Sequence, residues 1–80
     1  MQLIKIYTKK RCPYCTSAKI WLTQKNYQFE EIKLDDTKIL KKFLEKNPSL
    51  KTVPQIFINI DKKDISIGGF SELIKSKYFK

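Results

Sequence analysis

The chain contains no histidine and only two cysteines among its 80 residues. A closed zinc site within one chain needs about four nitrogen or sulfur ligands, so this sequence is too poor in ligands to build one. A metal shared between two chains is the alternative that this composition leaves open. We therefore expect no metal site within the chain, and the two cysteines need another explanation.

Glycine is also scarce, with two residues, and the sequence has no low-complexity stretch, internal repeat or linker. With 41% hydrophobic residues, the chain has the composition of a fully folded protein. A chain of 80 residues forms one small core, so residues 1–80 are expected to be a single domain. No feature of the sequence demands more than a monomer.

No apolar run approaches the length of a membrane span, and the segment 1–7 is too short and too closely flanked by charge for a signal peptide. We therefore expect a cytoplasmic protein that does not contact membranes. The cytoplasm is reducing, and there a lone Cys-x-x-Cys motif is more often catalytic than structural.

Acidic residues are few: eight Asp and Glu stand against 17 Lys and Arg, which gives a net charge of +9. Such an excess can indicate nucleic-acid binding. The lysines are nevertheless spread over every predicted helix and turn, without a basic tail or a stripe interleaved with aromatic residues. A solvated lysine-rich surface is the better interpretation, with acidic partners attracted and no nucleic acid bound.

The two cysteines lie in Cys12-Pro13-Tyr14-Cys15, between a predicted strand and a predicted helix. Residues 3–7 are a β-branched and aromatic run, which indicates a buried strand. A helix is predicted next, because no Gly or Pro occurs from residue 16 to residue 27 and four residues recur there at three- and four-residue steps: Ala18, Trp21, Leu22 and Lys25. The proline of the motif suits a first helical turn, because its missing N–H would be unpaired there.

The position of the two cysteines favours dithiol redox chemistry. A thiol at a helix start ionises readily because the unpaired N–H groups and the helix dipole favour an anion, and the basic residues 9–11 add positive charge beside Cys12. Cys12 is therefore expected to be the nucleophile. Cys15, one turn deeper, should be more buried and should resolve mixed disulfides by attacking Cys12. A purely structural disulfide is disfavoured, because a bond across three residues closes almost no loop.

A second strand and a second helix are predicted after the motif. Residues 28–34 alternate polar and apolar side chains, which predicts the strand. Asp35 or Asp36 can then cap a helix that ends at Asn47-Pro48. The inner face of that helix is predicted to be apolar: Ile39, Leu40, Phe43 and Leu44.

A hairpin and a last helix complete the predicted fold. Residues 55–60 and 65–67 predict two antiparallel strands around the polar turn 61–64, and Gly68-Gly69 then breaks the chain before a helix. The inner face of this helix is predicted to be apolar: Phe70, Leu73, Ile74 and Tyr78. The order βαβαββα predicts an α/β protein with a four-stranded mixed sheet and helices on both of its faces.

Three motifs in order, at this spacing, resemble one known family over nearly the whole chain. They are Tyr7-Thr8-Lys9 leading to Cys12-Pro13-Tyr14-Cys15, then Thr52-Val53-Pro54-Gln55-Ile56-Phe57-Ile58, then Ile67-Gly68-Gly69-Phe70-Ser71-Glu72-Leu73. The chain is similar to a dithiol glutaredoxin of the Cys-Pro-Tyr-Cys type, a family with a thioredoxin-like fold. Each motif alone is only suggestive, whereas the combination is highly specific.

The resemblance implies a glutathione-binding site that is built in part from backbone. In the family, the proline of the Thr-Val-Pro segment is cis and faces the cysteines, so Pro54 is expected to be cis. The backbone of Thr52 and Val53 is expected to pair, strand-like, with the cysteinyl part of glutathione. Tyr14 is expected to shield the mixed disulfide; an ordinary surface aromatic is the alternative.

The resemblance also implies charged contacts to both ends of glutathione. Lys9 is expected near the glycine carboxylate, with Lys41 as a second cation. At the other end, backbone N–H groups at Ser71 and Glu72 would hold a carboxylate, and the Glu72 side chain would pair with the γ-glutamyl amine. Relatives usually have aspartate at this position, so the longer Glu72 is a departure that can weaken the contact with the amine.

The favoured function is that of a glutathione-dependent thiol–disulfide oxidoreductase. It would reduce protein disulfides through both cysteines and glutathionylated substrates through Cys12 alone, with glutathione as the reducing co-substrate. Its partners would be glutathione and disulfide-bearing or glutathionylated proteins, of which ribonucleotide reductase is a common one in the family. Two alternatives remain: a redoxin reduced directly by a thioredoxin-type reductase, and a glutathione-ligated iron–sulfur carrier.

Overall fold

The computed structural model describes residues 3–79, and within this range the elements follow the predicted order βαβαββα. The strands are β1 (Leu3–Thr8), β2 (Glu30–Lys33), β3 (Gln55–Ile60) and β4 (Lys63–Gly68). The helices are α1 (Pro13–Gln24), α2 (Thr37–Lys46) and α3 (Phe70–Lys75). Asp36 caps α2, with its carboxylate accepting hydrogen bonds from the Lys38 and Ile39 N–H groups, so the predicted cap is confirmed.

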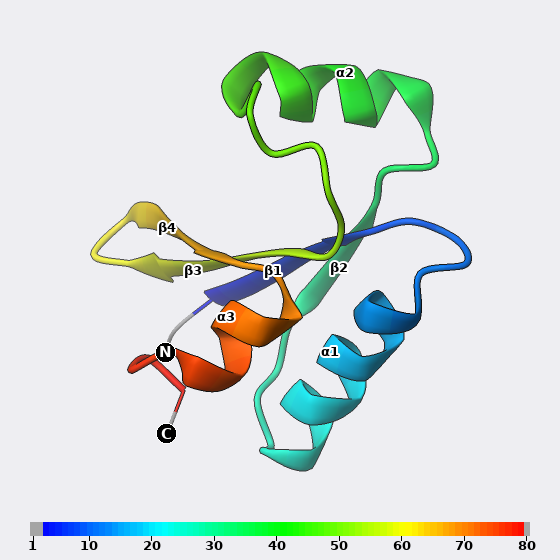
Figure 1. The fold of residues 1–80 in the computed structure, drawn as a ribbon. Coiled ribbons are helices and arrows are strands. Elements are labelled where there is room, and N and C mark those ends of the chain that lie inside the picture. The colour runs from blue at the N-terminus through cyan, green and yellow to red at the C-terminus, as the bar shows by residue number, and fades with distance from the viewer. Residues whose placement is uncertain (1–2, 80) are drawn as a thin grey trace.

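The strands form one mixed sheet in the order β2-β1-β3-β4 (Figure 1). β1 runs parallel to β2 and antiparallel to β3, and β3 runs antiparallel to β4. Because β1 and β3 are antiparallel, the end of β1 lies beside the start of β3, with Tyr7 paired to Gln55. The loop that leads to the first cysteine and the loop before β3 therefore meet at the same end of the two central strands.

Helices cover both faces of the sheet, as predicted (Figure 1). The larger core lies between the sheet and helices α1 and α3, and its buried members are Ile4, Ile6, Ala18, Leu22, Ile56, Ile58, Leu73 and Phe79. The smaller core lies under α2, and its buried members are Leu34, Phe43 and Phe57. The two helices on the larger core are the ones that carry the cysteines and the last of the three motifs.

The β3–β4 hairpin differs from its prediction. The turn is Asp61-Lys62 alone, and both residues have positive φ angles, 54° and 66°. Two consecutive left-handed residues are typical of the tightest hairpin loops, whose twist matches that of the strands. The strand therefore begins at Lys63 rather than at residue 65, and the predicted turn 61–64 was too long. Strand β2, at Glu30–Lys33, is shorter than the predicted 28–34.

The helix faces were predicted only in part. Ile39 on α2 and Ile74 on α3 are 39% and 46% exposed, so neither belongs to a core. Helix α3 ends at Lys75, and Tyr78 packs against the larger core from the segment that follows. In that segment the Phe79 ring is buried at the core and contacts the ring of Trp21 on α1. The chain leaves the helix early because Phe79 reaches the core from a turn.

Candidate active site

The two cysteines lie at the N-terminus of α1, as predicted. Cys12 is the N-cap residue, with the extended backbone angles φ −115° and ψ 98°, and Pro13 is the first residue of the helix. The Cys12 and Cys15 sulfurs are joined in a disulfide, and their Cα atoms lie 5.2 Å apart. Cys15 is 2% exposed and Cys12 is half-buried, so the predicted difference in burial is confirmed.

The surroundings of the two sulfurs are unequal. Cys12 Sγ accepts a hydrogen bond from the Cys15 N–H at 3.1 Å, and the carbonyl oxygen of Val53 lies 3.7 Å from the same sulfur. No donor within residues 3–79 bonds to Cys15 Sγ. A helix N–H that points at a sulfur stabilises negative charge on it, so the geometry favours Cys12 as the thiolate once the disulfide is reduced.

A groove adjoins Cys12 on the side of the loop before β3. The Val53-Pro54 peptide bond is cis, which confirms the expectation for Pro54. The groove, here called the proline groove, has a volume of about 310 Å³ and is lined by Tyr14, Leu50, residues 52–55 and residues 68–72. It thus brings together these predicted glutathione-binding residues: Tyr14, Thr52, Val53, Pro54, Ser71 and Glu72.

The Glu72 side chain folds back on the start of its own helix. Its Oε1 atom accepts a hydrogen bond from the Gly69 N–H at 2.7 Å. Gly68 has a φ of 113°, and a Cβ atom at that position would lie 2.9 Å from Glu72 Cγ. Glycine is therefore needed at 68 both for its backbone conformation and for space. Glu72 Oε2 has no hydrogen-bond partner within the described residues.

Lys9 lies between two other depressions rather than in the proline groove. It lines the pocket described next, together with Cys12, and also a cavity of about 230 Å³ that it shares with Thr52 and Val53. The structure does not bring Lys41 to this place, because that side chain lies on α2 beside Leu44. Of the two cations expected near the glycine carboxylate, Lys9 alone is adjacent to the site.

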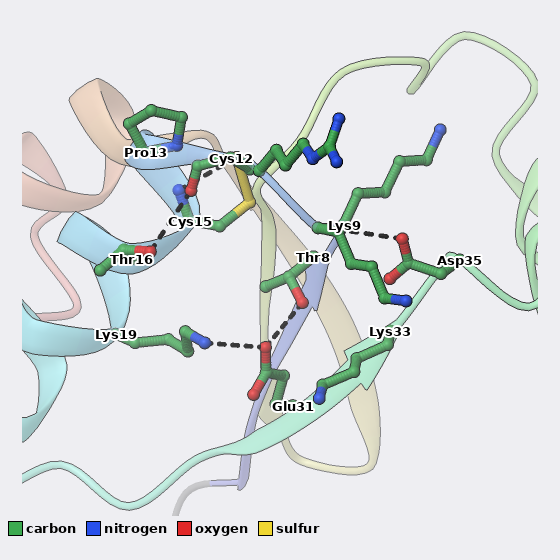
Figure 2. A pocket seen from close by; sticks show the side chains of 12 residues that line it. Thr8, Lys9, Cys12, Pro13, Cys15, Thr16, Lys19, Glu31, Lys33 and Asp35 are labelled. Carbon is green, nitrogen blue, oxygen red and sulfur yellow. Dashed lines mark hydrogen bonds and ion pairs between the residues drawn. A yellow bond between two sulfur atoms is a disulfide. The ribbon is translucent and has the colours of Figure 1, made fainter.

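A second, larger pocket adjoins the disulfide on its other flank (Figure 2). It has a volume of about 530 Å³, is here called the charged pocket, and is lined by residues 8–13, Cys15, Thr16, Lys19, Glu31, Lys33 and Asp35. Asp35 accepts a hydrogen bond from the Lys10 N–H at 3.1 Å. The side chains of residues 9–11 and of Lys33 make no hydrogen bond or ion pair within residues 3–79. The pocket therefore presents positive charge beside the disulfide.

Three polar side chains are joined at the base of the charged pocket. Glu31 Oε2 accepts a hydrogen bond from Thr8 Oγ1 at 2.7 Å and forms an ion pair with Lys19 Nζ at 3.0 Å (Figure 2). The Thr8 hydroxyl is the main cause that holds the pKa of the Glu31 carboxyl below its usual range, with Lys19 contributing and burial opposing.

Sequence reasoning missed this cluster of Thr8, Lys19 and Glu31. Lys19 stands four residues after Cys15, a helical spacing that was available as a signal. The role of Glu31 depends on the parallel pairing of β1 with β2, which puts Glu31 opposite Ile6. No pattern in the sequence specifies that register.

Within residues 3–79, no three His, Cys, Asp or Glu side chains come close enough together to hold a metal ion. None of the helices in the same range has the length and apolar character needed to cross a membrane.

The fold and the site define a class of protein: a thioredoxin-like dithiol protein, with a disulfide at the start of the first helix that faces a cis-proline loop. The profile of the glutaredoxin family matches residues 4–62. Glutaredoxin 1 of Rickettsia felis is 41% identical over 75 residues, which cover 91% of this chain and 70% of that protein. The chain therefore belongs to the glutaredoxin family.

Solved structures agree with this assignment. The crystal structure of glutaredoxin 1 from Francisella tularensis, complexed with cacodylate, has a TM-score of 0.75 and 39% identity, and the match covers 94% of this chain and 91% of that one. A buckwheat glutaredoxin–glutathione complex has a TM-score of 0.71 and 25% identity over 94% of this chain and 67% of that one. Family membership together with the Cys12–Cys15 pair supports thiol–disulfide oxidoreductase activity.

Proposed function

We propose that the protein is a glutathione-dependent thiol–disulfide oxidoreductase in which Cys12 attacks and Cys15 resolves. The observation that carries this proposal is that the two cysteines differ in exposure and in the hydrogen bonding of their sulfurs. Cys12 is the accessible one and receives a helix N–H at 3.1 Å, whereas Cys15 is 2% exposed. A nucleophile must ionise and meet its substrate, and a resolving thiol needs only to reach its neighbour.

The proposed reaction with a protein disulfide has two exchange steps. The Cys12 thiolate attacks one sulfur of the client disulfide, forms a mixed disulfide and releases the other client sulfur as a thiolate. The Cys15 thiolate then attacks Cys12 Sγ, which closes the Cys12–Cys15 disulfide and releases the second client thiolate. The client gains two electrons and the protein loses two.

Glutathione returns the protein to its dithiol form. One glutathione thiolate attacks Cys12 Sγ, which frees Cys15 and leaves a Cys12–glutathione disulfide. A second glutathione thiolate attacks the sulfur of the bound glutathione, so that oxidised glutathione leaves and Cys12 is a thiolate again. A glutathionylated substrate enters at the same mixed disulfide: Cys12 attacks the glutathione sulfur and the client departs as a thiolate.

The proline groove is the proposed binding site of glutathione. We assign the strand-like pairing to the backbone of Thr52 and Val53, beside Pro54, because Val53 is the residue that approaches Cys12 Sγ. Tyr14, which is 66% exposed, is assigned to cover the mixed disulfide. The buckwheat complex, in which a related protein was solved with glutathione, supports this assignment of the ligand.

The ends of glutathione are assigned to charged and polar groups around the groove. Lys9 would contact the glycine carboxylate from the neighbouring cavity, which it shares with Thr52 and Val53. Ser71 and Glu72 would contact the γ-glutamyl end, with Glu72 Oε2 accepting from the amine while Oε1 keeps its bond to Gly69.

The proposal extends to the cellular setting. We infer a single-domain monomer that acts in the cytoplasm, where the glutathione pool sets the redox poise, on disulfide-bearing or glutathionylated proteins. Ribonucleotide reductase is a candidate client through the family alone.

The test of this function is which reductant reduces the oxidised protein. The purified disulfide form is mixed either with glutathione, glutathione reductase and NADPH or with a thioredoxin-type reductase and NADPH, and NADPH consumption is followed with a glutathionylated peptide as substrate. We expect rapid turnover with glutathione and little with the reductase alone. Turnover with the reductase alone and none with glutathione would instead identify a reductase-coupled redoxin.

A further inference from the structure

In the proposed mechanism, the buried Cys15 thiol must ionise although burial disfavours its thiolate. The resolving step needs a thiolate, and a sulfur buried in apolar surroundings ionises less readily than an exposed one. Cys15 is 2% exposed, and no hydrogen-bond donor within residues 3–79 reaches its sulfur. The helix N–H that serves this purpose is directed at Cys12 instead. Some other group must favour the Cys15 thiolate.

Lys19 is the cation on α1 that is placed to do so. It stands one turn after Cys15, a spacing at which side chains on a helix are neighbours, and both residues line the charged pocket (Figure 2). The side chain of Lys19 is 34% exposed and that of its partner Glu31 is 25% exposed. A partly buried charge is screened less by water and salt than the exposed cations of the neighbouring loop.

Other charged groups face the same pocket from each element around it. They are Lys9, Lys10 and Arg11 from the loop after β1, Lys33 from β2 and Asp35 from the segment after β2. All five are exposed, and Asp35 accepts a hydrogen bond from the Lys10 N–H. These exposed charges act on Cys15 through water, which weakens their effect. Lys19 and Glu31 differ from them because they form an ion pair with each other at the base of the pocket.

We propose that Lys19 favours the thiolate of Cys15, and that Glu31 is a positioning residue that both holds Lys19 in place and limits the positive charge that Cys15 senses. This inference rests on the resolving role of Cys15 in the proposed function. Neither Lys19 nor Glu31 exchanges a bond in the reaction. Thr8 contributes by fixing the Glu31 carboxylate through the hydrogen bond of 2.7 Å.

The two members of the ion pair should therefore have opposite effects on Cys15. Lys19→Gln removes the nearby positive charge, which disfavours the thiolate and raises the thiol pKa. Glu31→Gln keeps an oxygen that can accept the hydrogen bond from Lys19 Nζ but removes the nearby negative charge, which favours the thiolate and lowers the thiol pKa. A merely structural ion pair would give the same sign in both variants, since either change breaks the same contact.

The test is a titration of Cys15 in the Cys12→Ser protein, where it is the only cysteine. The ¹³Cβ chemical shift of labelled cysteine, followed against pH, reports the thiol state even for a buried side chain. We expect Lys19→Gln to raise the midpoint by about half to one pH unit and Glu31→Gln to lower it by a similar or smaller amount. Lys19→Arg, which keeps the charge, should restore the parent midpoint, and Lys25→Gln at the C-cap of α1 should leave it unchanged.

The second readout is the resolving step in the protein with both cysteines. The rate at which a Cys12–client mixed disulfide releases its client is measured against pH, and the profile should move to higher pH in Lys19→Gln and to lower pH in Glu31→Gln. Midpoints that move in the same direction in both variants, or an unchanged midpoint in Lys19→Gln, would overturn the inference. The titration uses no glutathione, so this failure is distinguishable from a failure of the proposed function.

Discussion

The two flanks of the Cys12–Cys15 disulfide are built differently. The proline groove on one flank is lined by the cis-proline loop, by the two glycines and first residues of α3, and by the largely uncharged side chains of Tyr14 and Leu50. The charged pocket on the other flank is formed by long charged side chains from the loop after β1, from α1 and from β2. Cys12 is half-buried, lines the charged pocket and also lies near Val53 of the groove, whereas Cys15 is buried and lines the charged pocket but not the groove.

This difference suggests a division of labour between the flanks. In the proposed function, the groove at the cis-proline loop would hold one small peptide-like ligand, because the backbone of this loop is set by the fold and does not depend on rotamers. A pocket of lysines and carboxylates tunes charge, because each side chain can change the ionisation of a nearby sulfur. The predictions below separate the two flanks, from the largest expected effect to the smallest.

The largest effect is expected at Cys12 itself, where the two flanks meet. Cys12→Ser should abolish reduction of both protein disulfides and glutathionylated peptides, because a serine hydroxyl does not ionise near neutral pH and cannot replace the thiolate. Both activities are measured with glutathione and its reductase, and circular dichroism checks that the fold is kept. Appreciable turnover of either substrate would show that Cys12 is not the nucleophile.

The groove should be sensitive to a single methyl group at Gly68. Gly68→Ala places a Cβ atom 2.9 Å from Glu72 Cγ at a residue with φ 113°, so we expect a loss of about 1–3 kcal/mol in the free energy of unfolding. The KM for a glutathionylated peptide should rise as well, since Glu72 must move. Urea unfolding and steady-state kinetics measure the two effects.

Gly69→Ala is the matched control for this change. Its φ is −91°, and the added Cβ atom would meet only the end of the flexible Glu72 side chain at 3.2 Å and the Pro54 carbonyl oxygen at 3.6 Å. It should cost less stability than the change at Gly68. Equal losses in the two variants would contradict the close packing of Gly68 against Glu72.

A smaller effect is expected from the cation assigned to the glycine carboxylate. Lys9→Gln should raise the KM for a glutathionylated peptide by about two- to fivefold with little change in kcat, because an exposed ion pair contributes at most about 1 kcal/mol. Lys41→Gln is the control, since Lys41 lies on α2 away from both flanks. If the two variants behave alike, the assignment of Lys9 is wrong.

The smallest effect is a change in acid stability at the base of the charged pocket. The folded state lowers the pKa of Glu31, so the ionised carboxylate stabilises the fold above its unfolded pKa of about 4.3, and this contribution is lost as pH falls through the folded value. Glu31→Gln should therefore be less stable than the parent at neutral pH, and the gap should close by about pH 3. Urea unfolding midpoints of the parent and the variant are compared at neutral pH and at about pH 3. A difference in midpoint that stays the same at both pH values would mean that the charge of Glu31 does not contribute to stability.

The sequence predicted one flank far better than the other. The groove depends on Pro54 and on Gly68-Gly69, residue types whose backbone requirements are local, and the predicted binding residues other than Lys9 assemble there. The link between Lys19 and Glu31 depends on how β1 pairs with β2 and on which rotamers meet across a pocket. Sequence periodicity specifies which face a residue is on, but it does not specify strand register or side-chain partners.

The same limit explains where the predicted fold differs from the structure. The hairpin was placed in the correct segment, but the left-handed conformations of Asp61 and Lys62 are not residue-type requirements and could not be foreseen. Tyr78 was assigned to a helix by its spacing, whereas the burial of Phe79 against Trp21 ends that helix early. In both cases a tertiary contact or a turn overrode a local pattern.

The most direct test of the central claim is the behaviour of Cys15→Ser. This variant keeps the nucleophile and the proline groove, so it should still deglutathionylate peptides while it loses most reduction of protein disulfides, where the second thiol must free the mixed complex. Intact-mass measurement after exposure to oxidised glutathione should show a chain heavier by one glutathione, attached at Cys12. Equal loss of both activities with no adduct would contradict the account and favour a redoxin that does not use glutathione.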